Sequence, residues 1–172
     1  MKLPDNCPVA KMSPRQLLET EIRQLDCCRA GEAGSLIGTD DEPLCRPRKT
    51  NHEVYRFIWR SSFDGDAVVD ITREHQAIAL RWKRTFTAAA PSVTLSLNDW
   101  EELQRALKAA RFWFLDNAEK QLGLDGAQWL IKGRRGDIYH SVDRWSPEGA
   151  VHDLGRLFFA LAGPPLASVE LY

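Results

Sequence analysis

The hydrophobic pattern changes period at Glu53, and this change constrains the fold more than any other feature of the chain. Beyond it, every second residue is a large aromatic side chain, and the intervening positions hold Val54, Arg56, Ile58 and Arg60. An alternation of period two predicts a β-strand. Asp64-Gly65 then forms a tight-turn dipeptide before the β-branched run 67–72, which predicts a hairpin. A further alternating stretch, 78–86, extends the hairpin into an antiparallel meander with one dry face and one face carrying Arg and Lys.

The second half of the chain predicts a helix, a second hairpin and another helix. Ser96 and Asn98 are both capping residues, and an apolar stripe at helical spacing follows: Trp100, Leu103, Leu107, Ala110 and Phe114. Two strands, 128–131 and 138–145, are expected to join through the turn 133–136, and the pattern at 152–162 predicts a helix that ends at Gly163-Pro164-Pro165. Residues 166–172 then form a short tail or an edge strand.

The N-terminal third predicts one helix and a long connection. Ser13-Pro14 is a favourable helix start, and the apolar residues of 17–25 recur on one face. Residues 31–51 carry Gly, Pro and basic residues, which indicates a loop. We therefore expect an α+β fold, an antiparallel sheet of about five strands with about three helices packed on one face. Residues 1–52 would belong to the same domain as the α+β core formed by 53–172, and the place of the second hairpin in the sheet stays open.

Composition and charge exclude several classes of protein. The chain has 172 residues with 44% hydrophobic and 27% charged side chains, which is typical of a globular domain that needs no metal or disulfide support. A formal net charge of -1 provides no global attraction to nucleic acid or to an anionic membrane. Pro4, Asp5 and Asn6 interrupt any signal-peptide core, so we expect a cytoplasmic protein.

The four cysteines lie in the first 45 residues and match no metal-binding spacing: Cys7, Cys27, Cys28 and Cys45. Free thiols, one or two disulfides and a metal site all remain open, with free thiols favoured by the expected compartment. Asp64, Asp66 and Asp70 suggest a cation site, but the calcium-loop pattern is absent and the turn already explains Asp-Gly. We expect no metal and no cofactor.

Aromatic and basic residues each allow two interpretations. The chain has six tryptophans, which could stack a base or sugar ring or could fill the core; their place in apolar alternations favours the core. Basic residues gather at 46–49, 81–84 and 132–135. They could merge into one positive patch if the two hairpins lie side by side, or they could protect strand edges and loops against aggregation.

No catalytic motif is recognisable. The sequence lacks a G-x-S-x-G element, an H-E-x-x-H element and a glycine-rich phosphate loop. His140 and Asp143 are three residues apart, so a straight strand would place them on opposite faces. An enzyme site assembled from distant segments stays an alternative, with His140 acting together with Asp137, Asp143 or Arg144.

Part of the second half resembles a known pattern. Its residues are Phe112-Trp113, Gly123-Leu124-Asp125-Gly126, Trp129, Tyr139-His140 and Arg144-Trp145-Ser146-Pro147. This arrangement resembles a group of small bacterial proteins that are similar in size and α+β layout to immunity proteins, which neutralise toxins delivered between competing bacteria. The resemblance covers about 35 residues closely. Because Gly, Trp and Pro dominate the pattern, it implies a scaffold and assigns no site residue.

These observations favour a non-catalytic protein-binding protein, in its most concrete form an immunity protein that neutralises a cognate toxin by direct binding. The alternative is a small hydrolase or nucleic-acid-processing enzyme that uses an accessible His140. For the binding function we expect the partner, a protein and neither a membrane nor nucleic acid, to contact loop and turn residues: Arg46, Arg48, Asp64, Asp66, Arg134 and Arg135. Charge reversal at the last two should weaken binding without lowering the melting temperature.

Overall fold

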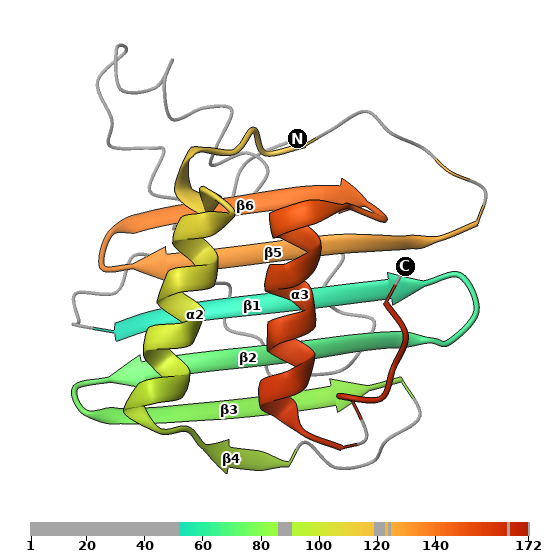
Figure 1. The fold of residues 1–172 in the computed structure, drawn as a ribbon. Coiled ribbons are helices and arrows are strands. Elements are labelled where there is room, and N and C mark those ends of the chain that lie inside the picture. Colours follow the sequence, from blue (N-terminus) through green and yellow to red (C-terminus); the bar gives the residue numbers. More distant parts are fainter. Residues whose placement is uncertain (1–51, 86–90, 119–122, 124, 165, 172) are drawn as a thin grey trace, which may run out of the picture.

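A computed structural model gives the structure of the chain (Figure 1). It describes residues 52–85, 91–118, 123, 125–164 and 166–171. The described elements are, in chain order, β1 (His52–Ser61), β2 (Asp66–Glu74), β3 (Ala77–Arg84), β4 (Ser92–Thr94), α2 (Leu97–Ala109), the 3-10 helix η3 (Phe112–Phe114), β5 (Ala127–Arg135), β6 (Ile138–Trp145) and α3 (Gly149–Ala162).

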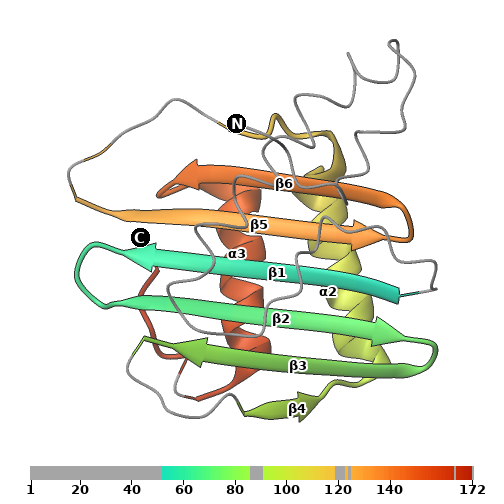
Figure 2. The ribbon, with the colours of Figure 1, turned by 180° about the vertical axis from the view of Figure 1, so that it is seen from behind.

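The strands form one antiparallel sheet in the order β4-β3-β2-β1-β5-β6. The predicted meander supplies β1, β2 and β3, and the second hairpin joins this meander beside β1, where Glu53 is opposite Arg135 and Ser61 is opposite Ala127. Both α-helices cross the same face of the sheet, as Figures 1 and 2 show from opposite sides. The α+β class, the antiparallel sheet and the helices on one face are therefore confirmed.

The hydrophobic core lies between the sheet and the two helices. Tyr55, Phe57 and Trp59 of β1 are fully buried there, as the alternation predicted. Phe57 contacts both Trp129 and Phe158, with ring centroids 5.1 and 5.7 Å apart. Buried aromatic rings in tilted contacts contribute more to stability than their buried area alone suggests. This layer fixes α3 on the sheet.

One glycine in α3 allows the helix to approach the sheet closely. A Cβ atom added at Gly155 would lie 2.1 Å from Cζ3 of Trp129, so no larger residue fits without displacing that indole. Glycine normally weakens a helix interior, and here the close approach of the tryptophan explains its presence.

The opposite face of the sheet carries charged residues, as predicted, but several of them are buried. Register places Arg56 between Asp70 on β2 and Lys132 on β5. Arg56 and Asp70 form a two-pronged ion pair: Nη2 donates to Oδ2 at 2.9 Å, and Nε donates to Oδ1. Burial of a paired charge costs much less free energy than burial of an unpaired one, so this face can hold a buried arginine.

Strand and helix counts differ from the prediction. The described sheet has six strands where about five were expected, because the short strand β4 adds to β3. The described residues contain two α-helices and one 3-10 helix where about three helices were expected. The predicted N-terminal helix and the four cysteines lie outside the described residues. The tail at 166–171 forms turns instead of an edge strand.

Two element boundaries also differ. A capping box between Ser96 and Asp99 starts α2 as predicted, but the helix ends at Ala109, and Phe114 lies beyond it. Arg111 follows with φ 51°, a left-handed conformation that stops helical propagation. The second hairpin was expected to turn at 133–136, yet β5 continues to Arg135, and only Gly136 and Asp137 form the turn.

Among the described residues no helix is both long and apolar enough to span a membrane.

Candidate binding site

An open hollow of about 600 Å³ lies where α2 ends, between η3 and the end of β5. Eight of the described residues line it: Gln104, Leu107, Lys108, Arg111, Phe112, Trp113, Phe114 and Arg135. Apolar side chains form most of the exposed wall, and polar side chains stand around it. Ligand sites in proteins commonly combine this size with such a lining.

The floor of the hollow depends on a close contact between η3 and β5. Phe112 is 1% exposed. Its ring lies against Gly133, where an added Cβ would be 2.7 Å from Cε1 of Phe112. The left-handed turn at Arg111 directs the chain from α2 into η3 and so brings this ring over the sheet. Trp113 stands edge-on to Phe112, with ring centroids 5.1 Å apart.

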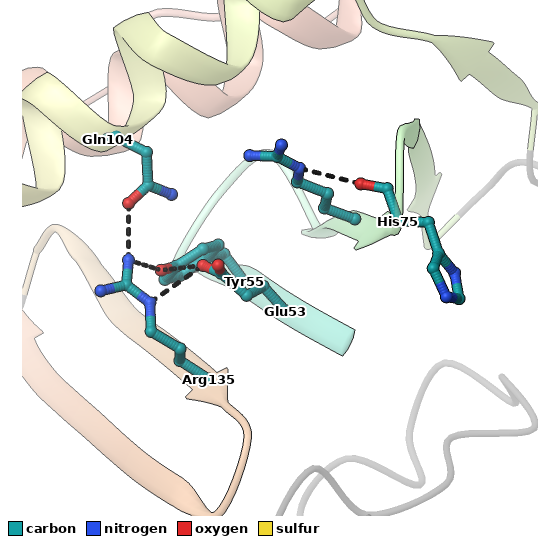
Figure 3. Close-up of polar contacts among 6 residues, drawn as sticks. Glu53, Tyr55, His75, Gln104 and Arg135 are labelled. Atoms are coloured by element: carbon teal, nitrogen blue, oxygen red, sulfur yellow. Dashed lines mark hydrogen bonds and ion pairs between the residues drawn. The ribbon is translucent and has the colours of Figure 1, made fainter. Parts of the chain in front are cut away.

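Arg135 forms the polar side of the hollow and is held by three hydrogen bonds (Figure 3). Its Nε donates to Oε2 of Glu53 at 3.1 Å, and its Nη2 donates to the Tyr55 hydroxyl at 3.2 Å and to Oε1 of Gln104 at 2.7 Å. Tyr55 in turn donates to Oε2 of Glu53 at 3.2 Å. The guanidinium also lies 5.8 Å from the ring centroid of Trp113. These contacts fix its orientation before any ligand arrives.

The surroundings of this network shift the pKa values of Tyr55 and Arg135. Burial raises the pKa of Tyr55, although the hydrogen bond with Gln104 and the charge of Arg135 oppose the shift. Burial by itself lowers the pKa of Arg135, but the interactions with Tyr55 and Glu53 outweigh burial and the pKa is raised. At neutral pH the tyrosine is therefore a neutral donor and the arginine a permanent cation.

Exposed aromatic and aliphatic groups stand next to the hollow. Phe114 is 82% exposed, and Ile138, the register partner of Arg135, is 64% exposed. Lys108 and Arg111 add two exposed cations to that of Arg135. Among the described residues that line the hollow there is no carboxylate. The surface is therefore apolar at its centre and positively charged at its rim.

The predicted partner-binding residues lie in different places. Arg135 lies at the hollow, on the helix side of the sheet. Arg134 is 4% exposed, and the alternation of β5 places it on the other face. Asp64 and Asp66 lie at the β1–β2 turn, the opposite end of β1 from Arg135. Ten residues of β1 correspond to about 30 Å of extended chain, so these groups do not form one surface. Arg46 and Arg48 lie outside the described residues.

The basic clusters within the described residues meet only in part. The hairpins do lie side by side through β1 and β5, as a merged patch requires. Arg81 and Lys83 share a sheet face with Lys132 and Arg134 by register, but Lys132 and Arg134 are buried. Burial excludes these two side chains from an open positive surface.

His140 does not have the setting that the enzyme alternative requires. It is 4% exposed, and its ring centroid lies 5.1 Å from that of Phe112 and 6.3 Å from that of Trp113. A general base needs access to its substrate. His140 lies beneath the aromatic floor, so it is not the accessible histidine that was proposed.

Most tryptophans are core residues, as predicted. Trp59, Trp82, Trp100 and Trp129 are each 8% exposed or less. Within the part of the chain that the structure describes, no cluster of three or more His, Cys, Asp or Glu side chains could hold a metal ion. Asp64 and Asp70 have different structural roles: Asp64 lies in the turn, and Asp70 forms the ion pair with Arg56.

Sequence reasoning missed most of the hollow. It assigned Phe114 to the apolar stripe of a helix, and it did not single out Gln104, Lys108 or Arg111. The run Phe112-Trp113-Phe114 was the available signal, since three consecutive aromatic residues cannot all face one core. No local signal places Arg135 beside that run.

The comparisons with known proteins add no relative: no protein-family model matches the chain, and no curated protein is significantly similar to it.

Proposed function

We propose that this chain is a non-catalytic protein-binding protein and that its partner docks on the hollow between α2, η3 and β5. Binding interfaces concentrate their energy in a few central aromatic and arginine side chains surrounded by a polar rim. The hollow combines Trp113, Phe114 and Arg135 in this way, with Lys108 and Arg111 outside them.

The exposure of Phe114 carries this proposal. A phenylalanine that is 82% exposed is not part of the core. Phe114 is also not an isolated exposed residue, because it lines the apolar hollow. Single exposed apolar residues need no explanation, but a contiguous apolar patch with a polar border is typical of an interaction surface. Phe63 is 72% exposed at the other end of β1 and does not line the hollow, so it provides a natural control.

In its most concrete form, the proposal is that the chain is a bacterial immunity protein that neutralises a cognate toxin by direct binding. Two observations support this form: the resemblance in size and layout described above, and a surface that suits tight complementarity without chemistry. The buried setting of His140 removes the residue on which the enzyme alternative depended.

A growth assay tests the proposal. Each secreted effector encoded beside the gene is expressed with wild-type chain, with Phe114→Ala or with Phe63→Ala. We expect wild type and Phe63→Ala to restore growth and to bind the effector in calorimetry, and Phe114→Ala to do neither at equal protein levels. The immunity function would be contradicted if the wild-type chain bound none of these effectors and protected against none of them.

A further inference from the structure

We infer that the partner segment recognised at the hollow presents an aromatic side chain with a carboxylate one residue away. This inference rests on the proposed function, because it specifies the chemistry of the partner at the same site. Three features of the hollow support it: the unused donors of Arg135, the aromatic walls and the uniform sign of the rim.

Arg135 has donors left for a ligand. Its Nε and Nη2 are engaged by Glu53, Tyr55 and Gln104, and no hydrogen bond within the described chain uses Nη1. Figure 3 shows this remaining nitrogen on the side of the guanidinium away from Glu53 and Tyr55. A guanidinium that is already oriented loses less conformational entropy when it binds a carboxylate.

The walls of the hollow suit an aromatic ring. Phe112, Trp113 and Phe114 line the open hollow of about 600 Å³, and Leu107 adds an apolar contribution from α2. Aromatic pairs prefer edge-to-face or offset contacts, and Phe112 and Trp113 already adopt an edge-to-face arrangement at 74°. An incoming ring can therefore continue this packing in a way that a small aliphatic side chain cannot.

The charges favour an anionic neighbour over a cationic one. Lys108, Arg111 and Arg135 all line the hollow, and Glu53, the carboxylate that contacts Arg135, already accepts from Arg135 and Tyr55. A lysine beside the partner's aromatic residue would meet cations from two sides, whereas a glutamate or aspartate could bind Nη1 of Arg135. Opposite charges on the two partners at the rim of an interface raise both the selectivity for the correct partner and the association rate.

Three blocked peptides test the inference on the full chain: acetyl-Glu-Phe-Glu-amide, acetyl-Gln-Phe-Gln-amide and acetyl-Glu-Ala-Glu-amide. Binding is followed by the NMR signal of the Trp113 indole N–H, assigned with Trp113→Phe. We expect the first peptide to bind with millimolar affinity and each of the others about threefold to fivefold more weakly, the range of an exposed ion pair or a partly buried ring.

Two variants and one control variant locate the interaction. Arg135→Gln should remove the preference for Glu over Gln, and Phe114→Ala should weaken both Phe peptides while Phe63→Ala changes neither. Equal binding of all three peptides, an unchanged Glu preference in Arg135→Gln, or no shift of the Trp113 signal at about 10 mM peptide would overturn the inference. If an effector nevertheless binds and loses affinity in Phe114→Ala, the proposed function stands and only the partner chemistry is wrong.

Discussion

The ring of Phe112 lies directly against the backbone of Gly133, so closely that a methyl group on that glycine would come within 2.7 Å of Cε1 of Phe112 and 3.0 Å of Cδ1 of Tyr55. This contact joins η3 to β5. It sets the floor of the hollow and also covers His140, which pairs with Gly133 across β5 and β6. The geometry of the proposed binding surface thus depends on the absence of one side chain.

Substituting Gly133→Ala should therefore destabilise the chain and distort the hollow. Two buried rings must move to admit the methyl group, and overpacking of this kind costs about 1 to 3 kcal/mol of unfolding free energy. Urea denaturation measures this cost. Gly136→Asn is the matched control: Gly136 has φ 57°, which asparagine tolerates, and among the described residues no atom beyond its two chain neighbours lies within 4 Å of its added Cβ. A loss of stability in the control equal to that in Gly133→Ala would contradict the contact.

Tyr55 should make the stability depend on pH in the alkaline range. Burial raises the pKa of its hydroxyl above the usual value of about 10, so the folded chain retains a proton that the unfolded chain releases. The stabilisation is complete below pH of about 10 and decreases as the pH rises toward the folded-state pKa. Unfolding free energies measured from neutral to alkaline pH should decrease less steeply in Tyr55→Phe than in the wild type. Parallel curves for the two proteins would contradict the assignment.

Arg134 and Arg135 should respond differently to the same substitution. Arg134 is 4% exposed on a central strand, so Arg134→Gln removes buried packing and charge and should cost about 2 kcal/mol or more. The side chain of Arg135, which forms an ion pair with Glu53, is 48% exposed. Arg135→Gln should therefore lower the unfolding free energy by about 1 kcal/mol or less. Thermal melts of the two variants test this difference.

This outcome would correct half of the expectation from sequence. Charge reversal at both arginines was expected to weaken binding and to spare the melting temperature. Burial of Arg134 argues against the second part for that residue, whereas the exposed side chain of Arg135 leaves the expectation in place there. The reason is the alternation of β5: adjacent residues of a strand point to opposite faces, and the turn that was thought to hold both begins only at Gly136. Equal melting temperatures for the two variants would contradict the predicted difference between the buried and the exposed arginine.

The elements that the sequence predicted well are those whose signals are local. The aromatic alternation in β1 and the Asp64-Gly65 turn predict the first hairpin, and the capping box at Ser96 and Asp99 predicts the start of α2. Each depends on residues within one strand or one helical turn, where periodicity and capping act.

The elements that it missed depend on contacts between distant segments. The apolar stripe continues past Ala109, and no glycine or proline marks the helix end, because the left-handed residue is Arg111. The residue type of Gly133 indicated a turn. In the structure, its missing side chain allows the ring of Phe112 to pack directly against β5. The hollow itself combines residues from the stretch 104–114 with Arg135 of β5, which pairs with β1, and these segments are distant in the sequence.

Hydrogen–deuterium exchange of the chain, alone and with an effector that it binds in the proposed growth and calorimetry tests, examines the binding surface most directly. We predict that complex formation slows exchange in residues 104–115 and 135–138 and that Phe114→Ala weakens both this protection and the binding, while Phe63→Ala retains them. Loss of a central aromatic contact should weaken the complex about 30-fold or more. Protection confined to the β1–β2 turn, or an unchanged affinity in Phe114→Ala, would contradict the account.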